Sequence, residues 1–356
     1  MEKSALEGVR IADFSMAWAG PYATTMLAFM GAEVIKIESR QRIDATRISH
    51  SLSHPADLDV NQGQSFHQLN PNKLSVTLNL RKPEAIELAR KIVAISDIVT
   101  ENFRPGVMDR LGLGYSVLKE VKPNVIMLSS SARGATGPER QYIGYAPQQG
   151  SVGGLAHLIG YSDSIPNVLH GNPDLECATM LAFAALAALH HRSQTGQGQY
   201  VDLAQPEALV CLTGDVIMDY TMNGRVRSRD GNYDDIMAPH NCYRCRGEDK
   251  WVSIAVSTEE EWTVFCEAMG NPEWANEERF GDMYARWRNR KELDALVEKW
   301  TTTHTHYEVM EILQGAGVPA MPCFNSEELF KDRHLKDRGV FAQVMEGCQS
   351  GKGEHR

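Results

Sequence analysis

The chain has 356 residues, of which 42% are hydrophobic and 23% charged, and a formal net charge of -10 at pH 7. This length predicts two lobes in a globular protein, and the negative charge argues against nucleic acid or an anionic membrane as the main partner. No apolar stretch is long enough to span a membrane and the N-terminus lacks signal-peptide features, so a cytoplasmic location is expected. The seven cysteines are expected to be reduced, and Cys242-x-x-Cys245 lacks a second zinc ligand pair, so no metal is expected.

The first residues predict a βαβ unit. Residues 9–14 and 33–38 are β-prone, and the apolar run 22–30 between them is an expected helix. Such units build parallel sheets with right-handed crossovers. The dinucleotide motif G-x-G-x-x-G is missing, but Ala-Gly-Pro at 19–21 would let a ligand approach a helix N-terminus. The alternative is that these three residues form a turn and have no role in ligand binding.

The alternation continues to residue 130. Strands are expected at 74–80, 97–103 and 125–130, and helices at 83–96, at 107–111 and near Leu118. Because ligands bind at the carboxyl ends of the strands in open α/β sheets, polar residues there are candidate contacts. These residues are Arg81, Asn102, Arg104 and Arg110, with a further group, Arg40, Arg42 and Arg47, in the irregular segment 39–71. Several arginines at strand ends favour a phosphate-bearing ligand over a merely solvated surface.

The stretch 172–199 is expected to be the central element of the chain, around which the rest is organised. It follows a Gly-, Ser- and Pro-rich segment, 132–171, that is interpreted as an active-site loop without core elements. Its Ala/Leu-rich run predicts a central helix buried on nearly every face. Asp174 is placed at the N-cap, where the helix dipole favours the ionised carboxylate. It is a candidate nucleophile; an ordinary capping residue is the alternative.

The remaining sequence predicts a smaller second lobe. A strand at 200–203 and a helix at 206–222 complete the first lobe, and a polar linker follows. The β-prone runs 241–246 and 251–256 form an expected hairpin. The expected domains are a large domain at 1–222, a linker at 223–239, a small α+β domain at 240–324 and a return segment at 325–356. The further expected elements are helices at 259–269, 289–302 and 306–315 and from 326, and strands at 318–324 and 340–345.

From the residues alone, two interpretations remain. The first is an enzyme for an anionic, nucleotide-like ligand, with Asp174 as nucleophile or base. The second is a non-catalytic α/β subunit of a complex, in which Asp174 caps a helix and the arginines are solvated.

An ordered set of motifs resembles the class III CoA-transferases, which include the formyl-CoA:oxalate and carnitine CoA-transferases and also the α-methylacyl-CoA racemases. The likeness extends over nearly the whole chain. The motifs are Ala-Gly-Pro (19–21), Gly-Ala-Glu-Val-Ile-Lys-Ile-Glu (31–38), Asp-Ala-Thr-Arg (44–47), Asn-Lys (72–73), Glu-Asn-Phe-Arg-Pro-Gly (101–106), Gly-Pro (137–138), the Asp174 helix, Thr-Gly-Gln-Gly-Gln (195–199) and Gly-Val-Pro-Ala (317–320).

The resemblance implies a Rossmann-like, CoA-binding large domain with an open α/β sheet, a smaller α+β domain, and two subunits interlocked as rings. The dimer is a homodimer or a heterodimer with a related chain. CoA or acyl-CoA is then a substrate rather than a prosthetic group, and a carboxylic acid accepts the CoA.

The resemblance also implies roles for single residues. The family's catalytic aspartate falls on Asp174, which would form an acyl anhydride and then an aspartyl-CoA thioester. The residues expected to contact CoA are Trp18, Ala19, Arg40, Leu78, Arg81, Asn102, Phe103, Arg104, Arg110 and Tyr145.

The chain departs from the family pattern at several places. Pro173 replaces a glycine before the aspartate, which stiffens the turn and removes one N–H group. Trp18 replaces a glutamine, and the glycine-rich flap of the oxalate enzyme is absent near 237–241, so a larger or more apolar substrate than oxalate is expected. The chain stops at Arg356, before the family's usual end, so a truncated sequence is one expectation.

The racemase branch is the enzymatic alternative. Racemisation needs an acid or base on each face of the α-carbon. The racemase histidine aligns with Tyr145 and its second acid with Arg244, and neither side chain exchanges protons readily near neutral pH.

Overall fold

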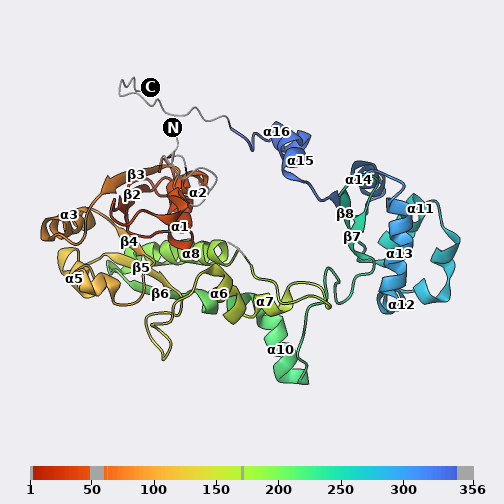
Figure 1. Ribbon diagram of the computed structural model, residues 1–356, viewed down its shortest axis with the longest axis horizontal. Coiled ribbons are helices and arrows are strands. Elements are labelled where there is room, and N and C mark those ends of the chain that lie inside the picture. Colours follow the sequence, from red (N-terminus) through yellow and green to blue (C-terminus); the bar gives the residue numbers. More distant parts are fainter. Residues whose placement is uncertain (1–2, 49–59, 62, 170–171, 343–356) are drawn as a thin grey trace. The chain divides into compact units, whose positions relative to one another are not determined.

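The computed structural model of the protein describes residues 3–48, 60–61, 63–169 and 172–342 (Figure 1). Its chain divides into two compact units, residues 1–230 and residues 231–356. The first unit contains a six-stranded parallel sheet and the second a three-stranded antiparallel sheet. No helix among the described residues is long and apolar enough to cross a membrane.

The sheet of the first unit has the strand order β3-β2-β1-β4-β5-β6, which is that of dinucleotide-binding sheets. The predicted α/β class is therefore confirmed. The order changes direction between β1 and β4, and ligands of such sheets bind beyond the carboxyl ends of the strands at this point. The strands are β1 (Arg10–Asp13), β2 (Glu33–Glu38), β3 (Lys73–Thr77), β4 (Ile98–Glu101), β5 (Ile126–Ser131) and β6 (Tyr200–Ala204).

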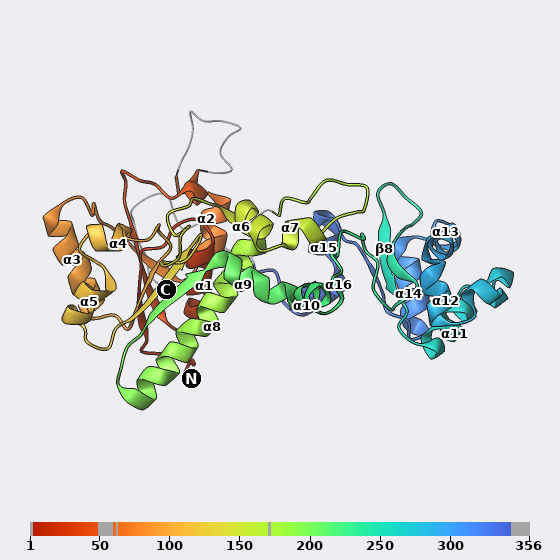
Figure 2. The same ribbon diagram turned by 90° about the horizontal axis from the view of Figure 1, so that it is seen from below.

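Helices cover both faces of this sheet (Figures 1 and 2). Helices α1 (Ala19–Phe29) and α8 (Asn172–Thr195) lie together on one face, where they pack on the even-numbered residues Ile126 and Leu128 of β5. On the other face lie α3 (Pro83–Ala94) and α5 (Tyr115–Val121), and the core there includes Val125 and Met127. Alternation along each strand thus assigns odd and even residues to different cores.

Helix α8 differs from its prediction in two ways. It begins at Asn172, so Asp174 lies in its first turn rather than at the N-cap. Its small residues pack against α1 and the sheet, with Ala178 and Ala185 fully buried, but Phe183 on another side is 73% exposed. The prediction of a helix buried on nearly every face is therefore wrong for this chain by itself.

Short helices interrupt two segments whose predictions were simpler. The predicted loop 132–171 contains α6 (Ala146–Val152) and α7 (Leu155–Leu158), with Gly154 between them at a positive φ of 87°. The helix predicted at 206–222 is two helices, α9 (Gln205–Val210) and α10 (Gly214–Asn223), separated by a 3-10 turn. The smaller helices of this unit are α4 (Val107–Arg110) and α2 (Gln64–Leu69), and the latter lies in the segment 39–71 that was predicted to be irregular.

In the second unit, β7 (His240–Arg244) and β8 (Trp251–Ala255) form the predicted antiparallel hairpin, and β9 (Ala320–Pro322) pairs with β8. Residues 340–342 of the predicted last strand are not in a strand, and 343–345 lie outside the described residues. The helices are α11 (Glu259–Ala268), α12 (Met283–Arg288), α13 (Arg290–Thr301), α14 (His306–Gly315), α15 (Ser326–Lys331) and α16 (Arg333–Asp337).

Candidate active site

Buried charges lie beneath the turn that joins β1 to α1. The Asp13 carboxylate is fully buried, with the Lys73 ammonium 3.2 Å from its Oδ2 atom. The Thr24 hydroxyl donates to the same oxygen at 2.7 Å, and the Ser15 N–H group donates to Oδ1 at 3.0 Å. Burial alone would raise the pKa of Asp13, but Lys73, Lys36 and these hydrogen bonds lower it below its usual value. Asp13 is therefore a buried carboxylate held in its ionised form.

A second pair of buried charges holds the turn itself. The Lys36 ammonium donates to the Ser15 carbonyl at 2.9 Å and lies 3.7 Å from Asp44 Oδ2. Asp44 Oδ2 in turn accepts the N–H group of Ala17, at 3.1 Å. Ala17 has a positive φ of 62°, and a Cβ atom on Gly20 would lie 2.3 Å from the Ser15 Cβ atom. The turn is thus a strained and tightly packed conformation that the buried charges stabilise.

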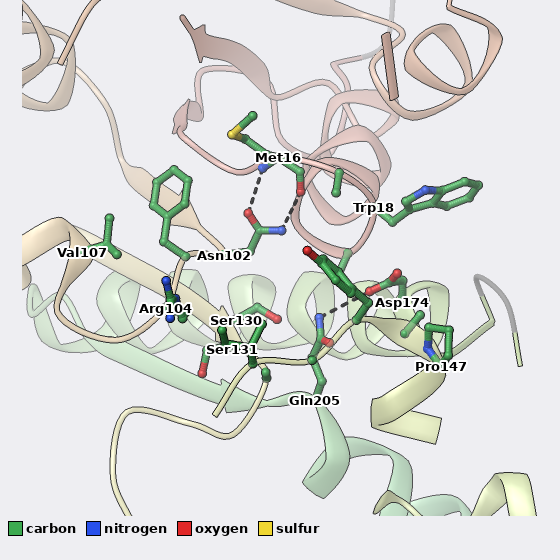
Figure 3. A pocket seen from close by; sticks show the side chains of 18 of the residues that line it. Met16, Trp18, Asn102, Arg104, Val107, Ser130, Ser131, Pro147, Asp174 and Gln205 are labelled. Atoms are coloured by element: carbon green, nitrogen blue, oxygen red, sulfur yellow. Dashed lines mark hydrogen bonds between the residues drawn. The ribbon is translucent and has the colours of Figure 1, made fainter. Parts of the chain in front are cut away.

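Asn102, which follows β4, fastens the same turn from the neighbouring strand. Its Oδ1 atom accepts the N–H group of Met16 at 2.8 Å, and its Nδ2 atom donates to the Met16 carbonyl at 2.6 Å (Figure 3). Both polar ends of the amide are engaged with backbone. Asn102 lies in the predicted position at a strand end, but these hydrogen bonds position the turn.

A cavity of about 780 Å³ opens above this turn, at the carboxyl ends of β1, β4 and β5 and beside the start of α8. Its wall combines apolar residues with a few polar groups, as is usual for small-molecule sites. We call it cavity 1. Its lining residues are Met16–Ala19, Arg42, Asn102–Arg104, Val107, Ser130–Ala132, Ile143–Pro147, Asp174 and Gln205.

A smaller cavity of about 220 Å³, cavity 2, shares Met16, Arg42, Phe103 and Val107 with cavity 1. The two cavities therefore meet at these side chains. Cavity 2 extends from the end of β2 to the loop after β3. The other residues that line it are Phe14, Lys36–Ser39, Gln41, Asp44, Leu78–Arg81 and Leu111.

The structure brings most of the predicted site residues to these cavities. Arg40 and Arg110 line neither, although Ser39 and Gln41 next to Arg40 line cavity 2. Arg47 of the arginine group is held by Glu38, with two N–O distances of 2.8 and 2.9 Å. Cavity 1 contains the predicted residues Trp18, Ala19, Asn102, Phe103, Arg104, Tyr145 and Asp174, and cavity 2 contains Leu78, Arg81 and, again, Phe103.

Asp174 is positioned by contacts between α8 and α9. The side chain of Gln205, the first residue of α9, donates from Nε2 to Asp174 Oδ1 at 3.5 Å (Figure 3). The carbonyl of Gln205 accepts a hydrogen bond from the Cys177 thiol, one turn after Asp174, also at 3.5 Å. Burial raises the pKa of Cys177 to about 12, so it stays a neutral thiol. Gln205 therefore contacts α8 through both its side chain and its backbone.

Burial raises the pKa of Asp174 to about 6, and the hydrogen bond from Gln205 lowers it only in part. The sequence predicted that the helix start favours the ionised carboxylate; burial opposes that preference and raises the pKa. A helix N-terminus stabilises a carboxylate by roughly 0.3–2 kcal/mol, and desolvation of a carboxylate costs more. Asp174 is still mostly ionised at neutral pH, but it is a poorly hydrated carboxylate.

Sequence reasoning missed several polar residues of cavity 1. Gln205 and Ser130 lie at the carboxyl ends of β6 and β5, so the strand-end rule that selected Asn102 would also have selected them. Arg42 was recognised only as one of a group of arginines. It lines both cavities, with its guanidinium 6.0 Å from the centre of the Phe103 ring.

The sequence of this chain is similar to known CoA-transferases. Residues 6–352 match the family model described as CoA-transferase family III. A succinyl-CoA--L-malate CoA-transferase alpha subunit of Chloroflexus aurantiacus is 36% identical over 346 residues, which cover 96% of this chain and 79% of that protein. A succinyl-CoA:mesaconate CoA-transferase of Haloarcula marismortui is 35% identical over 350 residues, covering 96% of this chain and 85% of that one.

A solved structure resembles the whole fold. The crystal structure of a CAIB/BAIF family protein from Brucella suis superposes with a TM-score of 0.84 and 31% sequence identity. The superposition covers 95% of this chain and 89% of that one. Sequence and fold thus agree on the same group of proteins.

The pKa of Asp174 generates a prediction about stability. Between pH 3.8 and about 6 the folded state binds the proton that the unfolded state releases, so the stability of the wild type falls as pH rises through this window. Asp174→Asn removes this cost and should raise the free energy of unfolding by on the order of 2 kcal/mol at pH 8, with no gain at pH 4. Urea unfolding at both pH values measures it.

Asp163→Asn, at an exposed position of the same unit, is the control and should change stability little at either pH. A gain for Asp174→Asn that is equal at pH 4 and pH 8 would contradict the raised pKa.

Proposed function

The chain belongs to CoA-transferase family III, and we propose that it moves CoA from an acyl-CoA donor to a carboxylic acid with Asp174 as the nucleophile. One observation carries the proposal. Among the described residues that line cavity 1, Asp174 is the only carboxylate, and none is a histidine, cysteine or lysine. The hydroxyls of Ser130, Ser131 and Tyr145 also line this wall, but its described residues offer them no histidine or lysine as an activating base, whereas an ionised Asp174 needs none.

The proposed reaction is a series of acyl exchanges without net proton transfer. An Asp174 oxygen attacks the thioester carbon, the C–S bond breaks, and a mixed anhydride and CoA thiolate result. The thiolate then attacks the Asp174 carbonyl carbon and releases the donor acid as a carboxylate, leaving an aspartyl-CoA thioester. The acceptor carboxylate attacks this thioester and releases CoA thiolate again. The thiolate attacks the acceptor's acyl carbon in the second anhydride, which yields the new acyl-CoA and free Asp174.

The environment of Asp174 suits this role. A carboxylate in water is a weak nucleophile because its hydration shell must be displaced, and burial has already removed part of that shell. With a pKa of about 6, the attacking form still predominates at neutral pH. The Gln205 amide holds one carboxylate oxygen and leaves the other free to attack.

The racemase alternative lacks a partner group in cavity 1. Racemisation requires an acid or base on each face of the α-carbon, and a single carboxylate serves one face. At the position where the racemase histidine would be expected, the wall of cavity 1 has Tyr145, which is exposed. The composition of cavity 1 therefore supports acyl exchange over racemisation.

We propose that the CoA phosphates lie between the two cavities. Cavity 2 holds Arg81 and Leu78, and Arg42 and Phe103 connect it to cavity 1. With the thioester at Asp174, a nucleotide of CoA would extend toward cavity 2, and Arg104 and Arg81 would hold phosphates by charge-assisted hydrogen bonds.

Succinyl-CoA is the proposed donor, because the relatives from Chloroflexus aurantiacus and Haloarcula marismortui are both named for it. Their named acceptors, malate and mesaconate, are dicarboxylic acids, and we propose an acceptor of that class. Arg42 and Arg104 are the cationic residues in the wall of cavity 1.

The decisive experiment follows the label on Asp174. Wild type incubated with succinyl-CoA and hydroxylamine should acquire a hydroxamate on Asp174, because amines trap anhydrides and thioesters. Peptide mass mapping locates it. Asp174→Asn should show no label and should lose at least about 10³-fold in transfer rate, since no other group forms the anhydride.

A panel of dicarboxylic acids, read by mass of the acyl-CoA product, identifies the acceptor. Near-normal transfer by Asp174→Asn would refute the aspartyl mechanism. If wild type binds CoA but transfers it to no acid, the chain is a non-catalytic subunit. One relative is named as an alpha subunit, so the assay is then repeated with a related chain added.

The arginine assignment predicts a change in CoA affinity. Arg104→Ala should raise the Kd for CoA about tenfold or more, because one hydrogen bond to a charged group contributes roughly 1.5–3 kcal/mol, and Arg104→Lys should raise it less. Calorimetric titration measures it. Lys119→Ala, which removes one exposed charge from α5 away from both cavities, should leave the Kd unchanged. Equal affinities in Arg104→Ala and wild type would remove Arg104 from the site.

We also propose that the protein functions as an interlocked dimer, either of two copies or with a related chain. Apolar side chains on α10, including Met218, Tyr220 and Met222, are more than half exposed, and a groove of about 330 Å³ lies between α7 and α10. Such surfaces are typical of subunit interfaces. Mass photometry after dilution to nanomolar concentration should still show dimers, because interlocked subunits separate only by unfolding. A folded monomer in rapid exchange would exclude this topology.

A further inference from the structure

The hydroxyl group of Ser130 has no hydrogen-bond partner among the described residues. It is buried, with the residue only 1% exposed, yet Ser130 lines cavity 1. A buried hydroxyl without a partner costs roughly 1–3 kcal/mol, because it has lost its hydrogen bonds to water. Such a group next to a cavity is explained if a ligand supplies the missing acceptor.

Strand geometry places this hydroxyl on the side of Asp174. Ser130 has the same parity as Ile126 and Leu128, which face the core that includes α8. Ser131 also lines the cavity without a partner, but it shares the face of Met127 and the opposite core. In Figure 3 the Ser130 hydroxyl points toward Gln205 and Asp174, and the Ser131 hydroxyl points the other way.

We propose that Ser130 donates a hydrogen bond to the carbonyl oxygen of the acyl group that Asp174 attacks. This inference rests on the proposed CoA transfer and assigns it a further group. When the Asp174 oxygen bonds to the thioester carbon, the π electrons of the carbonyl move to its oxygen, which becomes an oxyanion. The Ser130 O–H group stabilises that charge without giving up its proton. The electrons return to the carbonyl as CoA thiolate leaves.

The site requires such a donor. In the proposed reaction, attack transfers the negative charge of Asp174 to the substrate oxygen, and a fixed donor in the cavity wall stabilises that charge. The Gln205 amide has a second N–H group beyond the one directed at Asp174, and Gln205 lines the same cavity as Ser130. Ser130 lies at the end of β5, and Gln205 directly follows the neighbouring strand β6. These two donors would then share one oxyanion.

The first test is kinetic. Ser130→Ala should lower kcat for CoA transfer by about 10²-fold, as the loss of a single oxyanion donor does in other acyl-transfer enzymes, and should leave the Kd for CoA unchanged. The variant should be as stable as wild type or more so, because it removes an unsatisfied polar group. Thermal unfolding of the same preparation checks that the activity loss is not a loss of fold.

Thr100→Val is the matched control. The Thr100 hydroxyl, on the neighbouring strand β4, is also buried and has no partner in the part of the chain that the structure describes. It lies on the α8 face, but Thr100 lines neither cavity. Its replacement by a side chain of the same shape should leave kcat within about twofold of wild type, since only an unsatisfied hydroxyl is lost. Wild-type kcat in Ser130→Ala would overturn the proposal, as would an equal loss in Thr100→Val.

A second test needs no turnover. The ketone analogue of succinyl-CoA, with CH₂ in place of the thioester sulfur, keeps the carbonyl; the thioether analogue, with CH₂ in place of the carbonyl, lacks it. Wild type should bind the ketone more tightly than the thioether, and Ser130→Ala should lose about fivefold of this difference. An unchanged difference overturns the role of Ser130. Retained transfer in Asp174→Asn would instead refute the aspartyl mechanism of the proposed function, and the binding result still decides whether Ser130 contacts the acyl carbonyl.

Discussion

The pairing of Asp13 with Lys73, beneath the first turn of the sheet, is the interaction on which the site depends. Both groups are buried, and burial lowers the pKa of Lys73 to about 8 even though Asp13 opposes that shift. Buried ion pairs often contribute little net stability, because desolvation offsets their attraction. Here the pair also supplies hydrogen bonds to the turn, which an apolar pair could not do. Its hydrogen bonds, with those of Lys36 and Asp44, hold a turn with an unfavourable backbone conformation against the end of the sheet.

That turn determines where the two cavities meet. Met16 lines both of them, and its backbone is held from one side by the turn and from the other by the amide of Asn102. The parallel sheet brings the ends of β1 and β4 side by side, so residues 86 positions apart exchange two hydrogen bonds. Cavity 1 then extends to β5 and the first turn of α8. Asp174, the proposed nucleophile, and the expected phosphate contacts thus lie along one edge of the sheet rather than on loops alone.

How much of this could be predicted from sequence differs between the elements and the contacts. The strands and most helices up to residue 130 could be predicted, because apolar periodicity and turn residues mark them locally; helix α2, within the polar segment 39–71, was the exception. Asp174 and Arg104 could be selected as site residues, from a helix start and a strand end. Gln205 and Ser130 lie at strand ends, so the strand-end rule would have included them as candidates. It could not show that they line the same cavity as Asp174, because that depends on the pairing of β5 with β6 and on the face that each strand presents. The raised pKa of Asp174 was not foreseen, because a helix start is visible in sequence and desolvation is not.

The raised pKa of Asp174 and the unsatisfied hydroxyl of Ser130 are two sides of the same constraint. A cavity that removes water from a carboxylate makes it a better nucleophile, but it also withholds water from the oxyanion that attack creates. The proposed reaction therefore needs fixed donors where water would otherwise be, and one of them, the Ser130 hydroxyl, has no partner among the described residues. An unpaired Ser130 hydroxyl beside a destabilised Asp174 carboxylate is the arrangement expected of a site whose polar groups match the transition state rather than one another.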